Sequence, residues 1–213
     1  MKKLILAVTG LFLVFGLYTP ASSQFYMSAF GDARVVEPQQ FKLGGGILIS
    51  DDVMGLGGAG KYGLADGLEG SFRLGMIKID PNDHTGLTFG AHIMHQMLDV
   101  EFGDGVDIAI GGGAEYYSVG EDASLWMFGG NGIVSYPFEL SGGQIFSPFF
   151  RLNLRFDRVS ANDNSDTDFE FGFGFGSEFD ISEKFGLFAE VIIPGGDLDE
   201  AFVGGINFTF GTY

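Results

Sequence analysis

The stretch from Asp168 to Phe179, DFEFGFGFGSEF, alternates aromatic residues with glycine or charged residues. Successive side chains of a β-strand point to opposite faces, so this stretch predicts a strand with one aromatic face and one nearly bare face. The aromatic face would carry Phe169, Phe171, Phe173 and Phe175, and the bare face Glu170, Gly172, Gly174 and Gly176. The same period of two recurs along the chain, and helical periodicity is weak throughout.

The alternation divides the chain from Phe41 onward into about ten segments with the length and composition of strands. Most of them have the roughly 9–11 residues that a tilted strand needs to cross a bilayer. The expected strands are Phe41–Ser50, Gly58–Leu64, Leu68–Ile79, Thr85–Leu98, Val106–Ser118, Ser124–Tyr136, Phe146–Val159, Asp168–Phe179, Phe185–Ile193 and Ala201–Phe210. We therefore predict an all-β chain that folds as a closed antiparallel up-and-down transmembrane β-barrel of about ten strands, within a range of roughly 8–12.

The composition of the polar face favours a membrane barrel over a soluble sheet. A soluble sheet would expose many lysines and glutamates, whereas the polar face here consists mostly of Gly, Ser, Asn and Thr with a few mixed charges. In Phe146–Val159, for example, the residues opposite the apolar face are Arg151, Asn153, Arg155 and Asp157. We expect the phenylalanines to face lipid and the glycines to face the lumen, where Gly172, Gly174 and Gly176 leave room for larger side chains. A soluble secreted β-sandwich is the alternative.

Aromatic residues gather near the expected strand ends, where membrane barrels carry interfacial girdles. The candidate girdle residues are Tyr116, Tyr117, Trp126, Tyr136 and Phe149.

The N-terminus has the pattern of a secretory signal peptide. A basic start, MKK, precedes the apolar run LILAVTGLFLVFGLY and the sequence TPASSQ, whose small residues Ala21 and Ser23 favour cleavage after Ser23. The predicted organisation is a signal peptide at 1–23, a lead-in segment at 24–40 and the barrel at 41–213. The lead-in is compatible with a periplasmic extension, a plug in the lumen or an additional strand.

Charge and cysteine content exclude several classes of function. The formal net charge is −17, which disfavours nucleic acid as a partner because phosphate contacts require basic surface. The chain contains no cysteine, so disulfides, thiolate catalysis and a lipoprotein anchor are excluded. One set of expected connections is acidic or polar, with SDDVMGL, DPNDH, VGEDA, SANDNSDT and PGGDLDE. The other set contains ADG at 65–67, FGDG at 102–105, PFELSGG at 137–143 and ISEK at 181–184. An even strand number would place both termini on the periplasmic side and the acidic set outside the cell.

The C-terminal sequence FVGGINFTFGTY resembles the assembly signal of small Gram-negative outer-membrane barrels of the broad OmpA/OmpX-like porin family type. Ile206, Phe208 and Phe210 keep the alternation, while the terminal Tyr213 is out of register. The stretches KYGLADGLEGSFRLG and SEFDISEKFGLFAEV are similar to the periplasmic hairpins of these proteins. The resemblance implies residence in the outer membrane, contact with its lipid and lipopolysaccharide, and assembly by the barrel-assembly machinery.

A polar network inside the lumen is the main candidate site. Its expected members are Glu69, Arg73, His92, Asp107, Glu115, Arg151, Arg155, Glu170 and Glu190. Such charges are compatible with a selectivity network of a narrow pore. They are equally compatible with a structural salt-bridge plug, which we favour because charges in a narrow barrel must be paired.

Catalytic, metal and cofactor motifs are weak. His92 and His95 are three residues apart and would point to opposite faces of a strand, which disfavours a shared metal. No His-x-Ser-Asn-Gly motif of outer-membrane lipid hydrolases is present, and the glycine-rich stretches lack phosphate-loop spacing. The run at 162–168, NDNSDTD, lacks the spacing of a calcium loop and is interpreted as a solvated loop. We expect no enzyme and no cofactor. The expected role is structural, channel-like or surface-binding, with a lipid-modifying hydrolase as the alternative.

Overall fold

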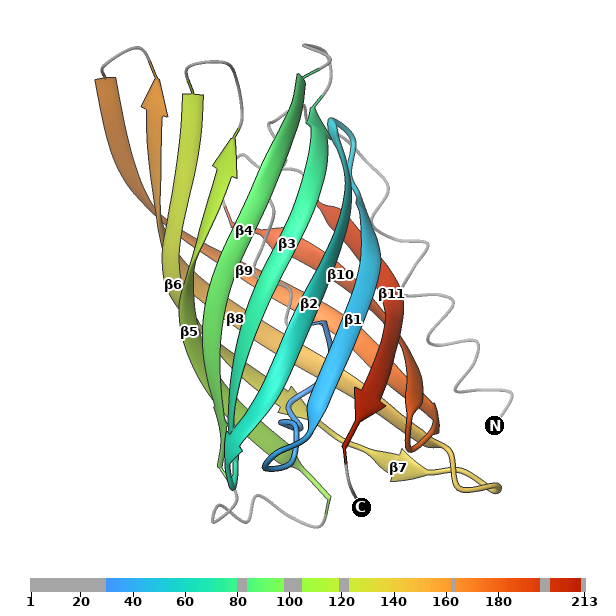
Figure 1. Ribbon diagram of the computed structural model, residues 1–213. Coiled ribbons are helices and arrows are strands. Elements are labelled where there is room, and N and C mark those ends of the chain that lie inside the picture. Colours follow the sequence, from blue (N-terminus) through green and yellow to red (C-terminus); the bar gives the residue numbers. More distant parts are fainter. Residues whose placement is uncertain are drawn as a thin grey trace.

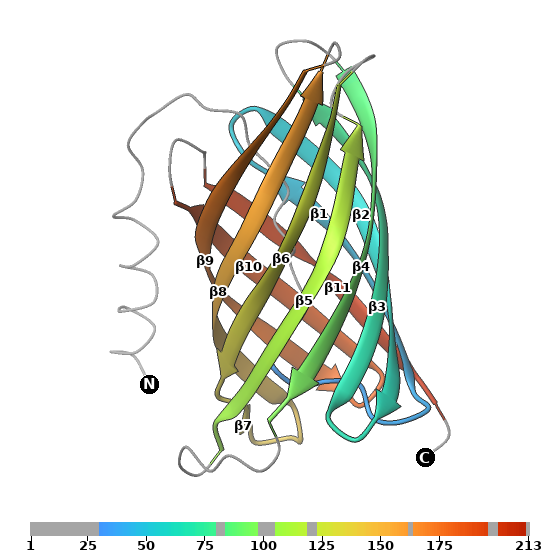
Figure 2. The ribbon, with the colours of Figure 1, turned by 90° about the vertical axis from the view of Figure 1, so that its left-hand side faces the viewer.

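The structure is a computed structural model that describes residues 30–79, 84–97, 105–118, 123–161, 164–195 and 200–211. Its strands form a single tilted barrel, seen from two sides in Figures 1 and 2. The strands are β1 Phe41–Ile49, β2 Val53–Ala65, β3 Leu68–Ile79, β4 His84–Gln96, β5 Asp107–Ser118, β6 Ala123–Ser135, β7 Phe138–Glu139, β8 Ile145–Ala161, β9 Asn164–Ser182, β10 Phe185–Pro194 and β11 Ala201–Phe210. No helix in these ranges is long and apolar enough to span a membrane.

Ten of these strands close into a ring, and every neighbouring pair is antiparallel. The order around the ring is β1-β2-β3-β4-β5-β6-β8-β9-β10-β11, and β1 pairs with β11 to complete it. The predicted closed antiparallel barrel of ten strands is therefore confirmed. A closed ring leaves no strand edge open, as the hydrocarbon region of a membrane requires. It also excludes the alternative of a soluble β-sandwich.

The two ends of the barrel are called the terminal end and the distal end, according to which parts of the chain lie there. The terminal end carries the start of β1 at Phe41 and the end of β11 at Phe210, and the distal end carries the β1–β2 and β8–β9 connections. The C-terminus lies at the terminal end in Figure 1.

Several strand boundaries differ from the sequence prediction. β2 begins at Val53 rather than Gly58, because the segment predicted as an acidic connection pairs with both neighbours, Val53 with Ile79 and Met54 with Ile49. β9 begins at Asn164 rather than Asp168, since Ala161 pairs with Asn164. Most of the polar run predicted to be a solvated loop is thus paired strand. A two-residue strand, β7, lies in the connection predicted at 137–143.

The outer wall of the barrel is apolar, as the alternation predicted. Phe169, Phe171 and Phe175 are 57%, 43% and 47% exposed, whereas Gly172 and Gly174 of the same strand are buried. On β8 the outward residues are apolar from Phe146 to Phe156. This stretch corresponds to a band about 25 Å tall once strand rise and tilt are included, which matches the apolar band of outer-membrane barrels.

Two of the predicted girdle aromatics point into the barrel instead. Tyr117 is 2% exposed and donates a hydrogen bond to Glu115, and Phe149 is 6% exposed among buried apolar side chains. Their parity decides this, because odd-numbered positions of β5 and β8 face inward. Tyr116, Trp126 and Tyr136 remain on the outer wall, where Tyr116 and Trp126 lie with ring centroids 5.0 Å apart.

Candidate functional site

The lumen is closed by a segment of the chain itself. Residues 30–36, here called the plug, lie inside the barrel between the strands rather than outside it. Of the three places open to the lead-in segment, its described part therefore occupies the lumen, and the predicted signal peptide at 1–23 lies outside the described residues. Asp32 and Ala33 are 1% and 0% exposed, whereas Glu37, just beyond the plug, is exposed.

Polar side chains of six strands hold the backbone of the plug. The Asp32 N–H donates to Oε2 of Glu178 on β9 at 3.1 Å, and the Val36 N–H donates to Oε2 of Glu69 on β3 at 3.0 Å. These hydrogen bonds satisfy backbone N–H groups of the plug that would otherwise be buried without a partner. Four further bonds come from other strands. The Ala33 N–H donates to Oγ of Ser135 on β6 at 3.3 Å, and the Val35 N–H donates to Oε1 of Gln96 on β4 at 3.2 Å. Nη2 of Arg151 on β8 donates to the Gly31 carbonyl at 3.1 Å, and Nδ2 of Asn207 on β11 donates to the Phe30 carbonyl at 3.1 Å.

The plug also carries its own ion pairs. Nε of Arg34 contacts Oδ2 of Asp32 at 2.7 Å, and Nη2 of Arg34 contacts Oδ2 of Asp180 at 2.8 Å. Burial raises the pKa of the Asp32 carboxyl above its ordinary value, and the Glu178 carboxylate raises that pKa further. Burial alone would lower the pKa of Arg34, but the carboxylates of Asp32 and Asp180 outweigh this effect and raise that pKa.

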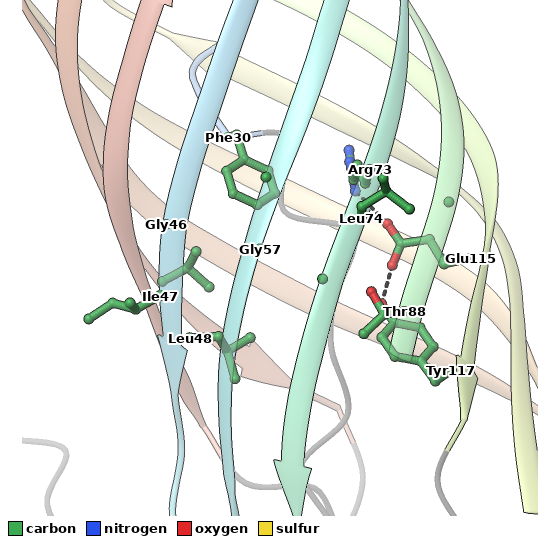
Figure 3. Close-up of a pocket in the computed structure, with 14 residues that line it drawn as sticks. Phe30, Gly46, Ile47, Leu48, Gly57, Arg73, Leu74, Thr88, Glu115 and Tyr117 are labelled. Atoms are coloured by element: carbon green, nitrogen blue, oxygen red, sulfur yellow. Dashed lines mark hydrogen bonds and ion pairs between the residues drawn. The ribbon is translucent and has the colours of Figure 1, made fainter. Parts of the chain in front are cut away.

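Ion pairs fill the middle of the lumen. Nη1 of Arg73 lies 2.5 Å from Oε1 of Glu115, and Nη1 of Arg151 lies 3.1 Å from Oε1 of Glu190. Figure 3 shows Arg73 and Glu115 with Tyr117 beside a void of about 40 Å³, which has room for water but not for a solute. Opposite charges therefore stand next to each other inside a barrel that offers them little solvent.

The remaining predicted site residues lie at the margins of this network. Nε of Arg155 lies 2.7 Å from Oδ1 of Asp157, two residues along the same strand. Nε2 of His92 lies 3.2 Å from Nδ2 of Asn131. Asp107 is half-buried and accepts a hydrogen bond from Gln96 at 3.0 Å, and Glu170 is half-buried opposite Arg155.

A second group of charges lies at the terminal end, and sequence reasoning missed three of its members, Lys42, Lys61 and Glu178, having named only Glu69. Nζ of Lys42 lies 2.5 Å from Oε1 of Glu178, and Nζ of Lys61 lies 3.5 Å from Oε1 of Glu69. The alternation could have identified them, because Lys42 and Lys61 both stand between outward-facing apolar neighbours. Glu178 and Glu69 each also bind the plug, so these four residues connect the barrel wall to it.

Two clusters of buried apolar side chains also lie inside the barrel. The distal cluster consists of Leu48, Val53, Ile77, Tyr117, Leu125, Met127, Phe188, Ile192, Ala201 and Val203, with Phe30 of the plug packed against it. The ring centroid of Phe30 lies 5.3 Å from that of Phe188. The second cluster lies beside the plug and consists of Ala33, Met94, Ala109, Ile133 and Phe149. A cavity of about 490 Å³ opens below the plug, at the terminal end, where Arg34 and Asp180 line it.

In the described ranges, no group of three or more His, Asp and Glu residues is placed to hold a metal ion.

The search of protein-family models found no match, and neither did the search of curated proteins. Solved structures do match. The β domain of the Bordetella autotransporter BrkA aligns with 80% of this chain and 98% of its own, at 13% identity and a TM-score of 0.52. The chain therefore has the fold of a transmembrane β-barrel.

A second solved structure supports the same fold. An outer membrane channel from Pseudomonas putida F1 aligns with 88% of this chain and 100% of its own, at 9% identity and a TM-score of 0.51. The N-terminal barrel domain of OprF from Pseudomonas aeruginosa is also similar, with 13% identity, coverage of 81% and 98%, and a TM-score of 0.41.

Proposed function

We propose that this chain is a sealed barrel of the Gram-negative outer membrane and that its role in the envelope is structural rather than that of an open pore. The observation that carries the proposal is the plug, whose backbone is hydrogen-bonded to six strands around the lumen. The apolar distal cluster supports it, because ions do not cross a dry apolar layer readily. The proposal includes export by the signal peptide, the terminal end in the periplasm and no catalytic role.

Conductance measurements test the seal directly. Purified full-length protein inserted into planar bilayers is expected to show no stepwise conductance. The same preparation should migrate on gels with heat-modifiable mobility, which demonstrates that the silent protein is a closed barrel. Reproducible unitary steps from protein with this mobility would contradict the proposal and favour a narrow channel.

Cysteine labelling tests whether the plug is seated in solution. The chain has no cysteine, so Ala33→Cys introduces a single thiol in the plug, and Glu37→Cys introduces one four residues away on the surface. In lipid vesicles, we expect a membrane-impermeant maleimide to label Ala33→Cys at least about tenfold more slowly than Glu37→Cys, because labelling requires the plug to open. Equal labelling rates would show that the plug leaves the lumen.

A further inference from the structure

The outer wall of the barrel carries very few charged side chains. Those present on the described strands are positive and lie near the distal end. Within the described parts of the ten barrel strands, the alternation places only two residues with permanently charged side chains on the outer face, Lys78 of β3 and Arg158 of β8. Both are cations, and both lie within three residues of the distal end of their strand. The acidic residues of these strands lie on the inward face, either in the lumen or beyond its distal end.

Arg158 stands just beyond the apolar band of β8. The outward residues before it, Leu154 and Phe156, are 46% and 55% exposed and belong to the lipid-facing wall, whereas Ser160 follows it. A band about 25 Å tall ends at this height, so the guanidinium lies at the level of lipid headgroups. Long basic side chains at this depth extend toward the polar interface.

Among the described residues, the side chains that surround Arg158 on the outer face are aromatic or carry hydroxyl groups, and none is an acid. Arg158 pairs in register with Trp126 of β6 and Thr167 of β9. A hollow of about 390 Å³ is lined by Ser124, Trp126, Phe128, Arg158 and Ser160. Asp166 and Asp168 alternate to the opposite face of the β8–β9 hairpin. Among the residues that the structure describes, Arg158 makes no ion pair.

The wall beside the hollow is rigid and apolar. Trp126 stacks on Phe128 with ring centroids 5.8 Å apart and meets Tyr116 at 5.0 Å. Tyr116 in turn stacks on Phe89 at 4.9 Å. An aromatic wall of this kind suits the upper part of an acyl chain, while a guanidinium above it suits a phosphate, which it can bind through two parallel hydrogen bonds.

We propose that this hollow is a binding site for the phosphate of an anionic lipid of the distal leaflet. Arg158 binds the phosphate, Ser124 and Ser160 supply hydroxyl groups beside it, and Trp126 and Phe128 contact the start of the acyl chain. The site rests on the proposed membrane location, which it deepens by naming the lipid chemistry. Charge complementarity selects the occupant, since the outer face of the described strands offers it a cation and no competing acid.

The protein carries its own reporter for this site, because Trp126 is the only tryptophan in the chain. Full-length protein is reconstituted into vesicles that contain phosphatidylcholine and phosphatidylglycerol. In one preparation the phosphatidylglycerol is brominated, and in the other the phosphatidylcholine is brominated. The quenching of Trp126 fluorescence is compared between the two preparations. We expect anionic lipid to be enriched about fivefold at Trp126 over neutral lipid. In Arg158→Gln the enrichment should fall to about onefold.

Two matched variants separate a site from a general surface charge. Lys78→Gln removes the same charge at the same end of the barrel, four strands away, and Lys184→Gln removes it in the β9–β10 turn at the terminal end. Both should retain the enrichment. The site is refuted if wild type shows no enrichment, if Arg158→Gln keeps it, or if Lys78→Gln loses it equally. If neither brominated lipid quenches Trp126 in protein with heat-modifiable mobility, the membrane location itself fails.

Discussion

Gly205→Val is expected to abolish closure of the barrel. Gly205 lies on β11 at the seam with β1, which joins the first and last strands of the ring. A Cβ at Gly205 would lie 2.1 Å from the carbonyl oxygen of Gly45 and 2.7 Å from Cα of Gly46. These contacts are with backbone, so no rotamer change relieves them. We expect a destabilisation of about 3 kcal/mol or more, at the upper end of overpacking.

Gly132→Val on β6 is the matched control for this substitution. A Cβ at Gly132 meets no atom within 4 Å, because this glycine faces outward. Folding is measured by heat-modifiable gel mobility after reconstitution into lipid. Gly132→Val should keep the compact band of unheated protein, and Gly205→Val should lose it. A compact band for Gly205→Val would show that the seam tolerates a side chain and that its glycines are not required for closure.

Arg151→Met is expected to destabilise the folded barrel by about 3–5 kcal/mol, the range for removing one member of a buried ion pair. Arg151 is 0% exposed and contacts the Glu190 carboxylate, itself 1% exposed, as well as the Gly31 carbonyl of the plug. Methionine fills much of the same space but removes the positive charge. The measurement is urea-induced unfolding of the reconstituted barrel, followed by Trp126 fluorescence.

Arg151→Met combined with Glu190→Gln should recover part of this loss, because no unbalanced charge then remains in the lumen. Lys184→Met in the exposed β9–β10 turn is the control and should change stability by less than about 0.5 kcal/mol. If Arg151→Met matched this control, or if the double variant were as unstable as the single one, the pair would not be a central element of the lumen.

The inward and outward faces of each strand could be predicted because they depend on local parity. Phe169 and Gly174 face opposite sides only because their positions in the chain differ by an odd number, and no distant contact is needed to establish this. The same reasoning failed for Tyr117 and Phe149, where an aromatic residue near a strand end was assigned to the girdle without regard to its parity. It also placed Arg73, Glu115, Arg151 and Glu190 on the lumen face, where the structure has them.

The partners of these residues could not be predicted from parity. Whether Arg155 meets Glu170 or Asp157 depends on side-chain geometry within the hairpin, and Arg73 meets Glu115 only because the stagger of β3, β4 and β5 brings them to one level. Stagger is a property of the closed ring and not of any one strand. The need for glycines at the β1–β11 seam could not be predicted from parity either, because their neighbours across the seam lie at the other end of the chain.

The amino-acid sequence by itself determined the barrel, its lipid-facing aromatic wall and its polar interior, because each of these follows from an alternation that every strand carries within itself. Only the tertiary structure decided that residues 30–36 lie inside the lumen. The plug has no periodic pattern, and its place in the lumen depends on carboxylates and hydroxyls more than 30 residues away in the chain, such as Glu69, Ser135 and Glu178. Those groups come together only when the ring closes around the plug.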